Sequence, residues 1–280
     1  MSLLVRNAVG LITVQDLGRP GRMHEALPPG GALVPSMLVR ANRAVGNPEG
    51  AAAIEVSGRL VVRAIAPCVV ASGSEARSLE VDDEIAIVSA PSRVTYLAVR
   101  GGVDAPIILG GRGAHLSAGI GGLVRKGDRI EIAEVAHDAL ARDTDDALAR
   151  DTDDAFARDM RDALASDPHD ELRVVPGPDL DAFEPSAIEM LTRTAWRIGS
   201  SSDRVGTRLE GATILRRADH VEASRPMVIG AIEIPRDGAP IVLGPEHPTT
   251  GGYPVIAVVA SDDLDAFHSI PLGGSVRFRV

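Results

Sequence analysis

Residues 59–73 read RLVVRAIAPCVVASG, and this stretch decides the fold that we expect. Leucine, valine and isoleucine dominate it, Pro67 interrupts it, and Ser72 and Gly73 end it. β-branched residues favour extended strands, whereas Pro, Ser and Gly mark the turns between them. Short runs of the same kind follow at 83–90, 93–99 and 128–135. The first half of the chain is therefore predicted to be mostly β.

The second half repeats this pattern in runs at 171–178, 195–211, 227–244, 253–261 and 275–280. Asp237 and Gly238 stand between two apolar segments and predict a hairpin, because glycine tolerates a positive φ. Each half also carries one predicted helix. Residues 36–48 have Ser36 as a candidate N-cap, and residues 185–195 place Glu189 four positions before Arg193. Two β-rich domains fit better than a βαβ series, which needs longer helices between its strands.

An eight-residue repeat separates the two halves, since ALARDTDD at 139–146 recurs unchanged at 147–154. In a helix, a period of eight would turn successive apolar residues by about 80°, so they would share no face. Residues 138–162 hold nine Asp and four Arg, a net charge of -5 out of -10 for the chain. We expect a solvated helical or disordered linker. The predicted organisation is an N-terminal domain at 1–135, an acidic Asp/Ala-rich linker at 136–170 and a C-terminal domain at 171–280.

Composition excludes several classes of protein. The chain of 280 residues is 45% hydrophobic, only 2% aromatic, and carries a net charge of -10, so we expect no nucleic-acid partner. No stretch offers the roughly 18 uncharged apolar residues of a membrane span. We therefore expect a soluble, cytoplasmic protein without membrane contacts. Cys68 is the only cysteine, and its apolar neighbours predict a buried thiol. The seven histidines are scattered singly along the sequence, so we expect no metal site.

The loop TVQDLGRPG at 13–21 is the first candidate binding segment. It places Gln15, Asp16 and Arg19 among glycine and proline turns that can aim a side chain. Arg19 could make a two-point contact with a carboxylate or phosphate. An ion pair between Asp16 and Arg19 that merely closes the turn is the alternative.

Two further segments contain charged side chains that could belong to a binding or catalytic site. In SSSDRVGTRLEG at 200–211, Arg204 and Arg208 would share one face of an extended strand and form a cationic pair, with Asp203 nearby. A solvated strand face is the alternative. In GAIEIPRDG, Glu233 lies within an apolar strand, where burial of a carboxylate is costly unless it is paired. It either faces water or is held for proton transfer or for an arginine.

The segment EHPTTGGYPV at 246–255 could bind an anion. Thr249 and Thr250 offer hydroxyl donors, and Gly251 and Gly252 would let backbone N–H groups approach a ligand as in an anion-binding nest. No lysine follows the glycines, so this is not a phosphate-binding Walker loop. A plain turn before the next strand is the alternative, and His247 alone is more often a surface or hydrogen-bonded histidine than a catalyst.

Taken together, these motifs resemble the family of the 5-oxoprolinase C subunit, also described as KipA, the antagonist of a sporulation-kinase inhibitor, and as allophanate hydrolase subunit 2. The same module occurs in biotin-dependent urea carboxylase. Eight segments carry the resemblance in the family's order: TVQDLGRPG, ANRAVGNPEGAAAIEV, YLAVRGGVDAPIILGGRG, GGLVRKGD, VVPGPDLDAF, SSDRVGTRLEG, IGAIEIPRDGAPIVLG and TTGGYPVIAVVASDDL. They span nearly the whole chain except the repeat at 138–170.

The resemblance implies a mainly β fold of two cyclophilin-like β-barrel domains. It implies a component of a heteromeric enzyme that opens 5-oxoproline to glutamate at the expense of ATP. Its partners would be a KipI-like B subunit together with an A subunit of the LamB/YcsF type, and which of the chains binds ATP is open. One alternative is a biotin-dependent carboxyltransferase component acting on urea or allophanate, with biotin on a separate carrier. The other is a non-catalytic regulator that antagonises a KipI-like kinase inhibitor.

The resemblance also implies roles for the candidate residues. Thr249, Thr250 and the N–H groups of Gly251 and Gly252 would hold a developing oxyanion. Arg204 and Arg208 would bind a substrate carboxylate or phosphate, with Asp203 orienting one of them. Alanine at Arg204 or at Thr250 is expected to remove turnover without lowering thermal stability. Glu233 would join this catalytic group, whereas substrate binding would fall to Gln15, Asp16, Arg19, His247, Gly251, Gly252 and Tyr253.

Three positions depart from the family's usual pattern. Val34 stands where the family usually has a carboxylate, and Glu233 replaces its usual glutamine. Residues 246–248, Glu-His-Pro, replace the usual Asp-Arg-Gln before TTGGYP. The side chains that lead into the site therefore differ from those of the relatives.

Overall fold

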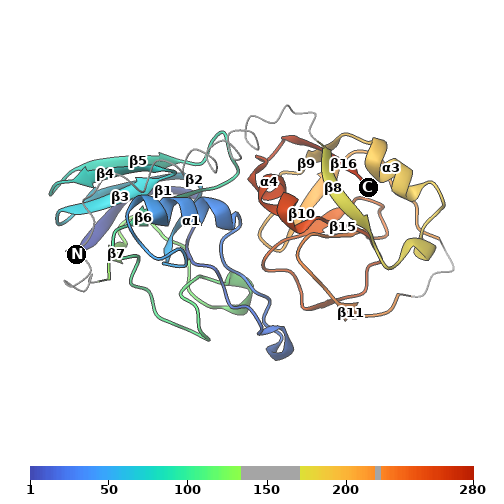
Figure 1. Ribbon diagram of the computed structural model, residues 1–280, viewed down its shortest axis with the longest axis horizontal. Helices are drawn as coiled ribbons and strands as arrows, with labels where there is room; N and C mark the ends of the chain where they lie inside the picture. The colour runs from blue at the N-terminus through green and yellow to red at the C-terminus, as the bar shows by residue number, and fades with distance from the viewer. Residues whose placement is uncertain (134–170, 218–221) are drawn as a thin grey trace.

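The computed structural model describes residues 1–133, 171–217 and 222–280. Figure 1 shows the two halves side by side, with a sheet in the N-terminal half and a barrel in the C-terminal half. The chain is mainly β, as the sequence predicts. The predicted Asp/Ala-rich linker at 136–170 lies outside the described residues.

Seven strands form the sheet of the N-terminal half. They are hydrogen-bonded in the order β4-β3-β6-β2-β1-β7, and β5 also pairs with β2. Among the described residues, no pairing joins β4 to β7, so this path is open where a barrel is expected. The strands are β1 (Ser2–Gln15), β2 (Ala53–Ala64), β3 (Cys68–Ser72), β4 (Glu75–Leu79), β5 (Glu84–Val88), β6 (Thr95–Val99) and β7 (Arg129–Glu131).

The long antiparallel pair β1 and β2 depends on two facing glycines. Gly10 lies opposite Gly58, with φ of 100° and 130°, a region that favours glycine. A Cβ atom on Gly10 would lie 2.1 Å from the carbonyl oxygen of Ser57. Only glycine fits such a close approach of the two backbones.

Helix α1 (Pro35–Ala44) covers part of the N-terminal sheet. Leu38 and Ala41 from the helix are buried in one cluster with Tyr96 and Ala98 of β6. The helix begins at Pro35, so the prediction of Ser36 as N-cap is wrong. Proline suits the first helical position because its missing N–H would have no intrahelical partner there.

The C-terminal half is a closed barrel with strand order β10-β13-β12-β15-β8-β16-β9. The pairs are antiparallel except for β16 with β8. The predicted hairpin at Asp237-Gly238 is confirmed, because it joins the antiparallel strands β12 and β13 and Gly238 has a φ of 76°. The strands are β8 (Glu171–Pro176), β9 (Trp196–Ile198), β10 (Gly206–Glu210), β12 (Ala231–Glu233), β13 (Ile241–Leu243), β15 (Val255–Val259) and β16 (Ser275–Arg279). Outside the barrel, β11 (Arg225–Pro226) and β14 (Thr250–Gly251) form a two-stranded ribbon.

Two α-helices flank this barrel, of which α3 (Ala187–Arg193) was predicted and α4 (Leu264–Ser269) was not. The predicted pair Glu189 and Arg193 is present at 2.8 Å. Short 3-10 turns occupy η1 (Met23–Glu25), η2 (Leu116–Ala118), η4 (Leu180–Ala182) and η5 (Ser261–Asp263). Within the described ranges, no helix has the length and apolar character needed to cross a membrane.

Helix α4 lies on the side of the barrel that faces the sheet (Figure 1). The carboxylate of Asp265 accepts a hydrogen bond of 2.9 Å from the backbone N–H of Ser36, at the start of α1. A carboxylate at a helix N-terminus satisfies a free donor and complements the helix dipole. The two halves are therefore in direct contact, and that contact positions the groups described next.

Candidate functional site

A buried polar cluster lies where the two halves meet, and we call it the junction cluster: Glu55, Arg93, Tyr96, Arg204 and Glu246. Its centre is Arg204, which is only 4% exposed. The guanidinium Nε donates to Glu246 at 2.6 Å, Nη1 donates to Glu55, and Nη2 donates to the carbonyl of Gly31. Burial alone would lower the pKa of Arg204, but the two carboxylates raise it above its ordinary value. Arg204 is therefore a fixed cation that joins the halves.

Glu55 extends the cluster into the N-terminal half. Its Oε2 accepts a hydrogen bond of 2.6 Å from the hydroxyl of Tyr96 and one of 2.8 Å from the N–H of Leu33. The Tyr96 hydroxyl in turn accepts from the N–H of Val34 at 3.0 Å. Burial and the neighbouring Glu55 carboxylate raise the pKa of Tyr96 well above its ordinary value. The tyrosine thus stays a neutral donor and fixes the carboxylate.

Arg93 ties the N-terminal half to the barrel a second time. Its Nη1 donates to the hydroxyl of Thr207 at 2.7 Å, and its Nη2 donates to the carbonyl of Asp203 at 2.9 Å. His268 of α4 lies close enough that Arg93 and Arg204 act on it electrostatically. Burial first, and then these two positive charges, lower the pKa of His268 to about 3. The imidazole is therefore neutral at physiological pH.

The expected cationic pair of Arg204 and Arg208 is wrong. Arg204 precedes β10 and is buried, whereas Arg208 lies within β10 and is exposed. The alternation rule applies only inside a regular strand, and position 204 is outside it. Asp203 does not orient an arginine through its carboxylate, which accepts instead from the N–H groups of Val205 and Gly206 at 2.9 and 3.0 Å.

Gln15 ends β1, Asp16 and Arg19 lie in the loop that follows it, and all three are buried. The Gln15 Nε2 donates to the carbonyl of Ala114 at 3.1 Å. Arg19 donates to three carbonyls, those of Ile108, Gly111 and Gly113, at 2.8 to 3.0 Å. Among the described residues, Arg19 makes no ion pair with Asp16, so the alternative of a bridge that closes the turn does not hold.

Asp16 holds the backbone around this loop. Its carboxylate accepts from the N–H of Gly18 at 2.8 Å and from the N–H of Arg112 at 2.5 Å. His115 follows closely in the chain, and its Nδ1 lies 3.7 Å from Oε2 of Glu246. Burial lowers the pKa of His115, although Glu246 acts in the opposite direction. The loop residues and the junction cluster therefore meet through His115 and Glu246.

The glycines of TTGGYP do not form the expected nest. Gly251 belongs to the extended strand β14 and pairs with Arg225, and neither Gly251 nor Gly252 has a positive φ. Gly251 is needed for space instead, because a Cβ atom there would lie 2.6 Å from Cε of Met227 and 2.8 Å from Oε1 of Glu233. Thr250 of β14 and Tyr253, which follows the strand, are both exposed. The carbonyl of Thr249 accepts a hydrogen bond of 3.1 Å from the backbone N–H of Met227.

Glu233 is buried at 5% exposure, which decides between the two alternatives that the sequence left open. The side chain is largely shielded from water, and no hydrogen-bond or ion-pair partner for its carboxyl is found within the described residues. Burial raises the pKa of Glu233 to about 7. Such a carboxyl exchanges a proton near neutral pH.

His247 is also buried, with its Nδ1 2.8 Å from the carbonyl oxygen of Pro248, and burial lowers the pKa of His247.

Two matches identify the family. The family described as "Carboxyltransferase domain, subdomain A and B" matches residues 78–280. A curated relative, the C subunit of 5-oxoprolinase from Escherichia coli (strain K12), is 31% identical over 290 residues, which cover 95% of this chain and 87% of the relative. This chain belongs to the carboxyltransferase domain family.

Further relatives place this carboxyltransferase domain within larger proteins. Urea amidolyase of Lachancea kluyveri is 28% identical over 95% of the chain, but the match covers only 16% of that protein. The crystal structure of TTHA0988 aligns with the whole of this chain, with a TM-score of 0.80 and 25% identity. The alignment spans 55% of the TTHA0988 chain. The crystal structure of Kluyveromyces lactis urea carboxylase covers 99% of the chain with a TM-score of 0.83, and the chain spans 27% of its length. At 22% identity, this last likeness concerns the fold alone.

Sequence analysis did not single out several buried polar residues of this chain: Glu55, Arg93, Tyr96, His115 and His268. One signal could have found Glu55. It lies inside the apolar segment AIEV, just as Glu233 lies inside AIEI, and a carboxylate in an apolar strand requires a partner when it is buried. The other four carry no comparable local signal, because their partners lie far away in the sequence.

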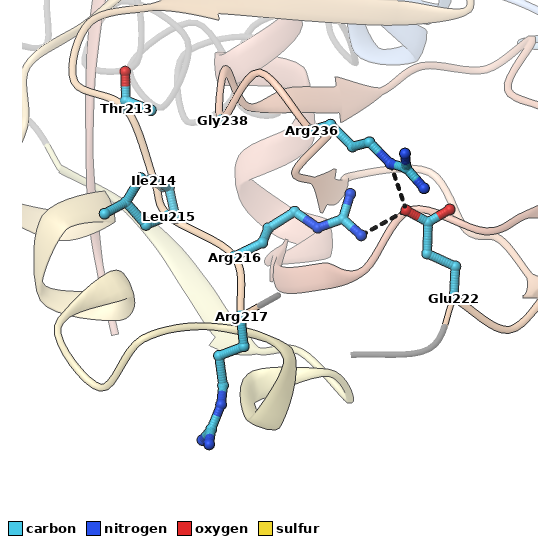
Figure 2. Close-up of a pocket in the computed structure, with 8 residues that line it drawn as sticks. All are labelled: Thr213, Ile214, Leu215, Arg216, Arg217, Glu222, Arg236 and Gly238. Atoms are coloured by element: carbon cyan, nitrogen blue, oxygen red, sulfur yellow. Dashed lines mark hydrogen bonds and ion pairs between the residues drawn. The ribbon is translucent and has the colours of Figure 1, made fainter. Parts of the chain in front are cut away.

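A cavity of about 450 Å³ lies elsewhere on the barrel and contains none of the predicted site residues (Figure 2). Arg216 and Arg236 point toward Glu222, at 2.6 and 3.6 Å, whereas Arg217 points away from it. The glutamate thus offsets part of the positive charge. The lining residues are Thr213, Ile214, Leu215, Arg216, Arg217, Glu222, Arg236 and Gly238.

Proposed function

We propose that this chain is one component of a heteromeric ATP-dependent amide hydrolase of the 5-oxoprolinase type, which converts 5-oxoproline to glutamate. The match to the C subunit of 5-oxoprolinase over 87% of that relative carries the proposal, since nearly the whole of both chains aligns. The proposed partners are a KipI-like B subunit together with an A subunit of the LamB/YcsF type. The enzyme would be active only as the complex.

Glu233 supplies the proton transfer in this proposal. Its pKa of about 7 leaves both the acid and the base populated at neutral pH, which is the condition for general acid and base catalysis. Gly251 lets another group approach the carboxyl closely, because a side chain there would collide with Oε1 of Glu233. Thr250 of the adjacent ribbon, together with its neighbours Thr249, Gly252 and Tyr253, would contact the substrate.

The ribbon does not suit the phosphates of ATP. A phosphate nest needs consecutive backbone N–H groups that converge, whereas the backbone at Gly251 is extended and paired with Arg225. We therefore propose that ATP binds to the partner proteins. Biotin, which only the alternative function requires, would arrive on a separate carrier protein.

The alternative function is a biotin-dependent carboxyltransferase component that acts on urea or allophanate. The matching family and the relative named urea amidolyase favour it. Both reactions require an amide-like group to be held while negative charge develops on its oxygen. The two functions therefore share a site but differ in the partner proteins.

Reconstitution tests the proposal. The chain is co-purified with its KipI-like partner, the third component is added, and ATP hydrolysis is measured with and without 5-oxoproline. Hydrolysis that depends on 5-oxoproline and on all three chains is expected. Carboxylation of urea with a biotinylated carrier would favour the alternative. Tight binding of the KipI-like partner without any turnover would contradict both and indicate a non-catalytic regulator.

A further inference from the structure

The cavity of about 450 Å³ on the C-terminal barrel takes no part in the proposed function. Its volume lies within the range of sites that hold small molecules. Two hydrogen bonds fix the backbone segment 213–217 that forms one wall. The N–H of Ile214 donates to the carbonyl of Gly238 at 3.0 Å, and the N–H of Arg217 donates to the carbonyl of Ala182 at 2.8 Å. The side chains of this wall therefore start from a fixed backbone.

Two guanidinium groups converge on one carboxylate oxygen in this cavity (Figure 2). Nη2 of Arg216 donates to Oε1 of Glu222 at 2.6 Å, and Nε of Arg236 lies 3.6 Å from the same oxygen. The arginines come from separate segments, one before β11 and one in the hairpin between β12 and β13. Among the described residues, Glu222 is the one carboxylate that lines the cavity. Two positive charges thus share one negative charge.

Glu222 satisfies the two arginines only in part. A guanidinium presents its N–H groups in a planar fork and pairs best with two oxygens of one anion. Here a single oxygen serves both forks, and 3.6 Å to Arg236 is longer than a normal hydrogen bond. The side chain of Arg236 is 87% exposed, against 12% for Arg216. Most of the donors on Arg236 are therefore open to a second anion.

The carboxylate of Glu222 marks the point at which an anion would bind. The hydrogen bond from Arg216, together with the charges of both arginines, lowers the pKa of Glu222, so negative charge is favoured there. When Glu222 turns into solvent, two guanidiniums remain, and they match a doubly charged oxyanion. A phosphate monoester carries about −1.5 to −2 charges at neutral pH and offers three acceptor oxygens. The triphosphate of ATP carries more charge than the two arginines offset.

An apolar side chain lines the same cavity. Leu215 is 64% exposed, whereas its neighbour Ile214 is buried. The apolar body of an organic phosphate would cover Leu215 and remove it from water, which inorganic phosphate does not do. A phosphate attached to a small organic group is therefore expected to bind more tightly than phosphate alone.

We propose that Arg216 and Arg236 form a binding site for a dianionic phosphate group, and that Glu222 occupies this site in its absence. The phosphate oxygens would replace the carboxylate, with Nη2 of Arg216 and Nε of Arg236 among the donors. The site shares no residue with the β11–β14 ribbon, with Glu233 or with the junction cluster. It goes beyond the proposed function and does not rest on it.

Binding of phenyl phosphate to the full chain tests the site. Calorimetry and ligand-observed NMR are carried out at a slightly alkaline pH, where the phosphate is a dianion. Phenyl sulfate has a similar shape but a single negative charge, and the wild-type chain is expected to bind it at least about tenfold more weakly. Inorganic phosphate distinguishes the two sources of the anion. Tighter binding of phenyl phosphate indicates an organic monoester as the ligand, and equal binding indicates free phosphate.

The charge variants have effects of opposite sign. Arg216→Gln and Arg236→Gln should each weaken binding of phenyl phosphate at least about tenfold, the loss of one charge-assisted hydrogen bond. Glu222→Gln should strengthen binding severalfold, because the competing carboxylate is removed. Arg217→Gln is the matched control, since it removes the same charge from the same segment while Arg217 points away from Glu222. Its loss should be much smaller.

The exposed position of Arg236 keeps the test valid even when Arg216→Gln does not fold. Equal binding of phenyl phosphate and phenyl sulfate, or equal losses in Arg217→Gln and Arg236→Gln, would overturn the site. Absence of binding in both the wild type and Glu222→Gln would also overturn it. Unchanged or weaker binding in Glu222→Gln contradicts the role of Glu222 as the occupant, whereas weak wild-type binding that tightens in this variant supports it.

Discussion

Arg204, just before β10, donates a hydrogen bond to Glu55 on β2, 149 positions earlier in the chain. Each partner is at least 96% buried, with 4% and 2% of the side chains exposed. A second carboxylate, Glu246, holds the same guanidinium at 2.6 Å. The relationship fixes how the barrel sits against the sheet, and it places the loop after β1 beside His115 and Glu246.

Loss of Arg204 should destabilise the protein strongly. In Arg204→Met, two buried carboxylates lose their counter-charge, and removal of one partner of a buried ion pair costs about 3–5 kcal/mol. Urea unfolding measures this loss. Arg43→Met breaks an exposed pair with Glu49 and should cost less than about 1 kcal/mol. The expectation that alanine at Arg204 spares thermal stability is thus reversed, and equal midpoints for the two variants would contradict the role of Arg204.

Tyr96→Phe should cost about 1–3 kcal/mol without any change of shape. The hydroxyl accepts from the N–H of Val34 and donates to Glu55, so its removal leaves one buried donor and weakens the support of the carboxylate. The same unfolding assay measures the effect. Because Tyr96 and Arg204 share Glu55, the double variant Tyr96→Phe, Arg204→Met should depart from additivity. Strict additivity would show that the hydroxyl does not act through Glu55.

Glu233 should make stability fall as pH rises. Its pKa is about 7 in the folded chain against an ordinary 4.5, so the folded state binds more protons between these values. The sign of the linkage then requires stability to be lost as pH rises from 4.5 through 7, by at most about 3 kcal/mol. Glu233→Gln should flatten the profile between pH 5 and 8, whereas Glu189→Gln, on the exposed face of α3, should not. An unchanged slope in Glu233→Gln would show that Glu233 titrates normally.

The adjacent glycines Gly251 and Gly252 differ in the space around them, so an alanine at Gly252 is the control for an alanine at Gly251. Gly251→Ala forces Cε of Met227 and the Glu233 carboxyl to move, and overpacking of this kind costs about 1–3 kcal/mol. Around Gly252 no atom lies within 4 Å of an added Cβ atom, so Gly252→Ala should be nearly neutral. Thermal unfolding of both variants checks the difference. Similar midpoints for the two would mean that the space at Gly251 is not restricted.

Local sequence rules predicted the strands well, because alternation, β-branching and turn residues act over a few positions. The hairpin at Asp237-Gly238 and helix α3 follow from such rules. Helix α4 was missed because it has only six residues, too few for a helical period to appear. Ser36 failed as N-cap because Pro35, one residue earlier, already begins the helix.

The candidate site also has features that the sequence predicts and features that it does not. The family motifs, and the loops that carry glycine, arginine and carboxylate side chains, can be read from the order of the residues alone. What those side chains contact depends on how the two halves pack. Packing of the two halves joined Arg204 to Glu55, withdrew Glu233 from water, and left Gln15, Arg19 and His115 each with one unpartnered atom. Burial and long-range pairing set the charge state and the free hydrogen-bonding atoms of a side chain, and neither depends on its neighbours in the chain.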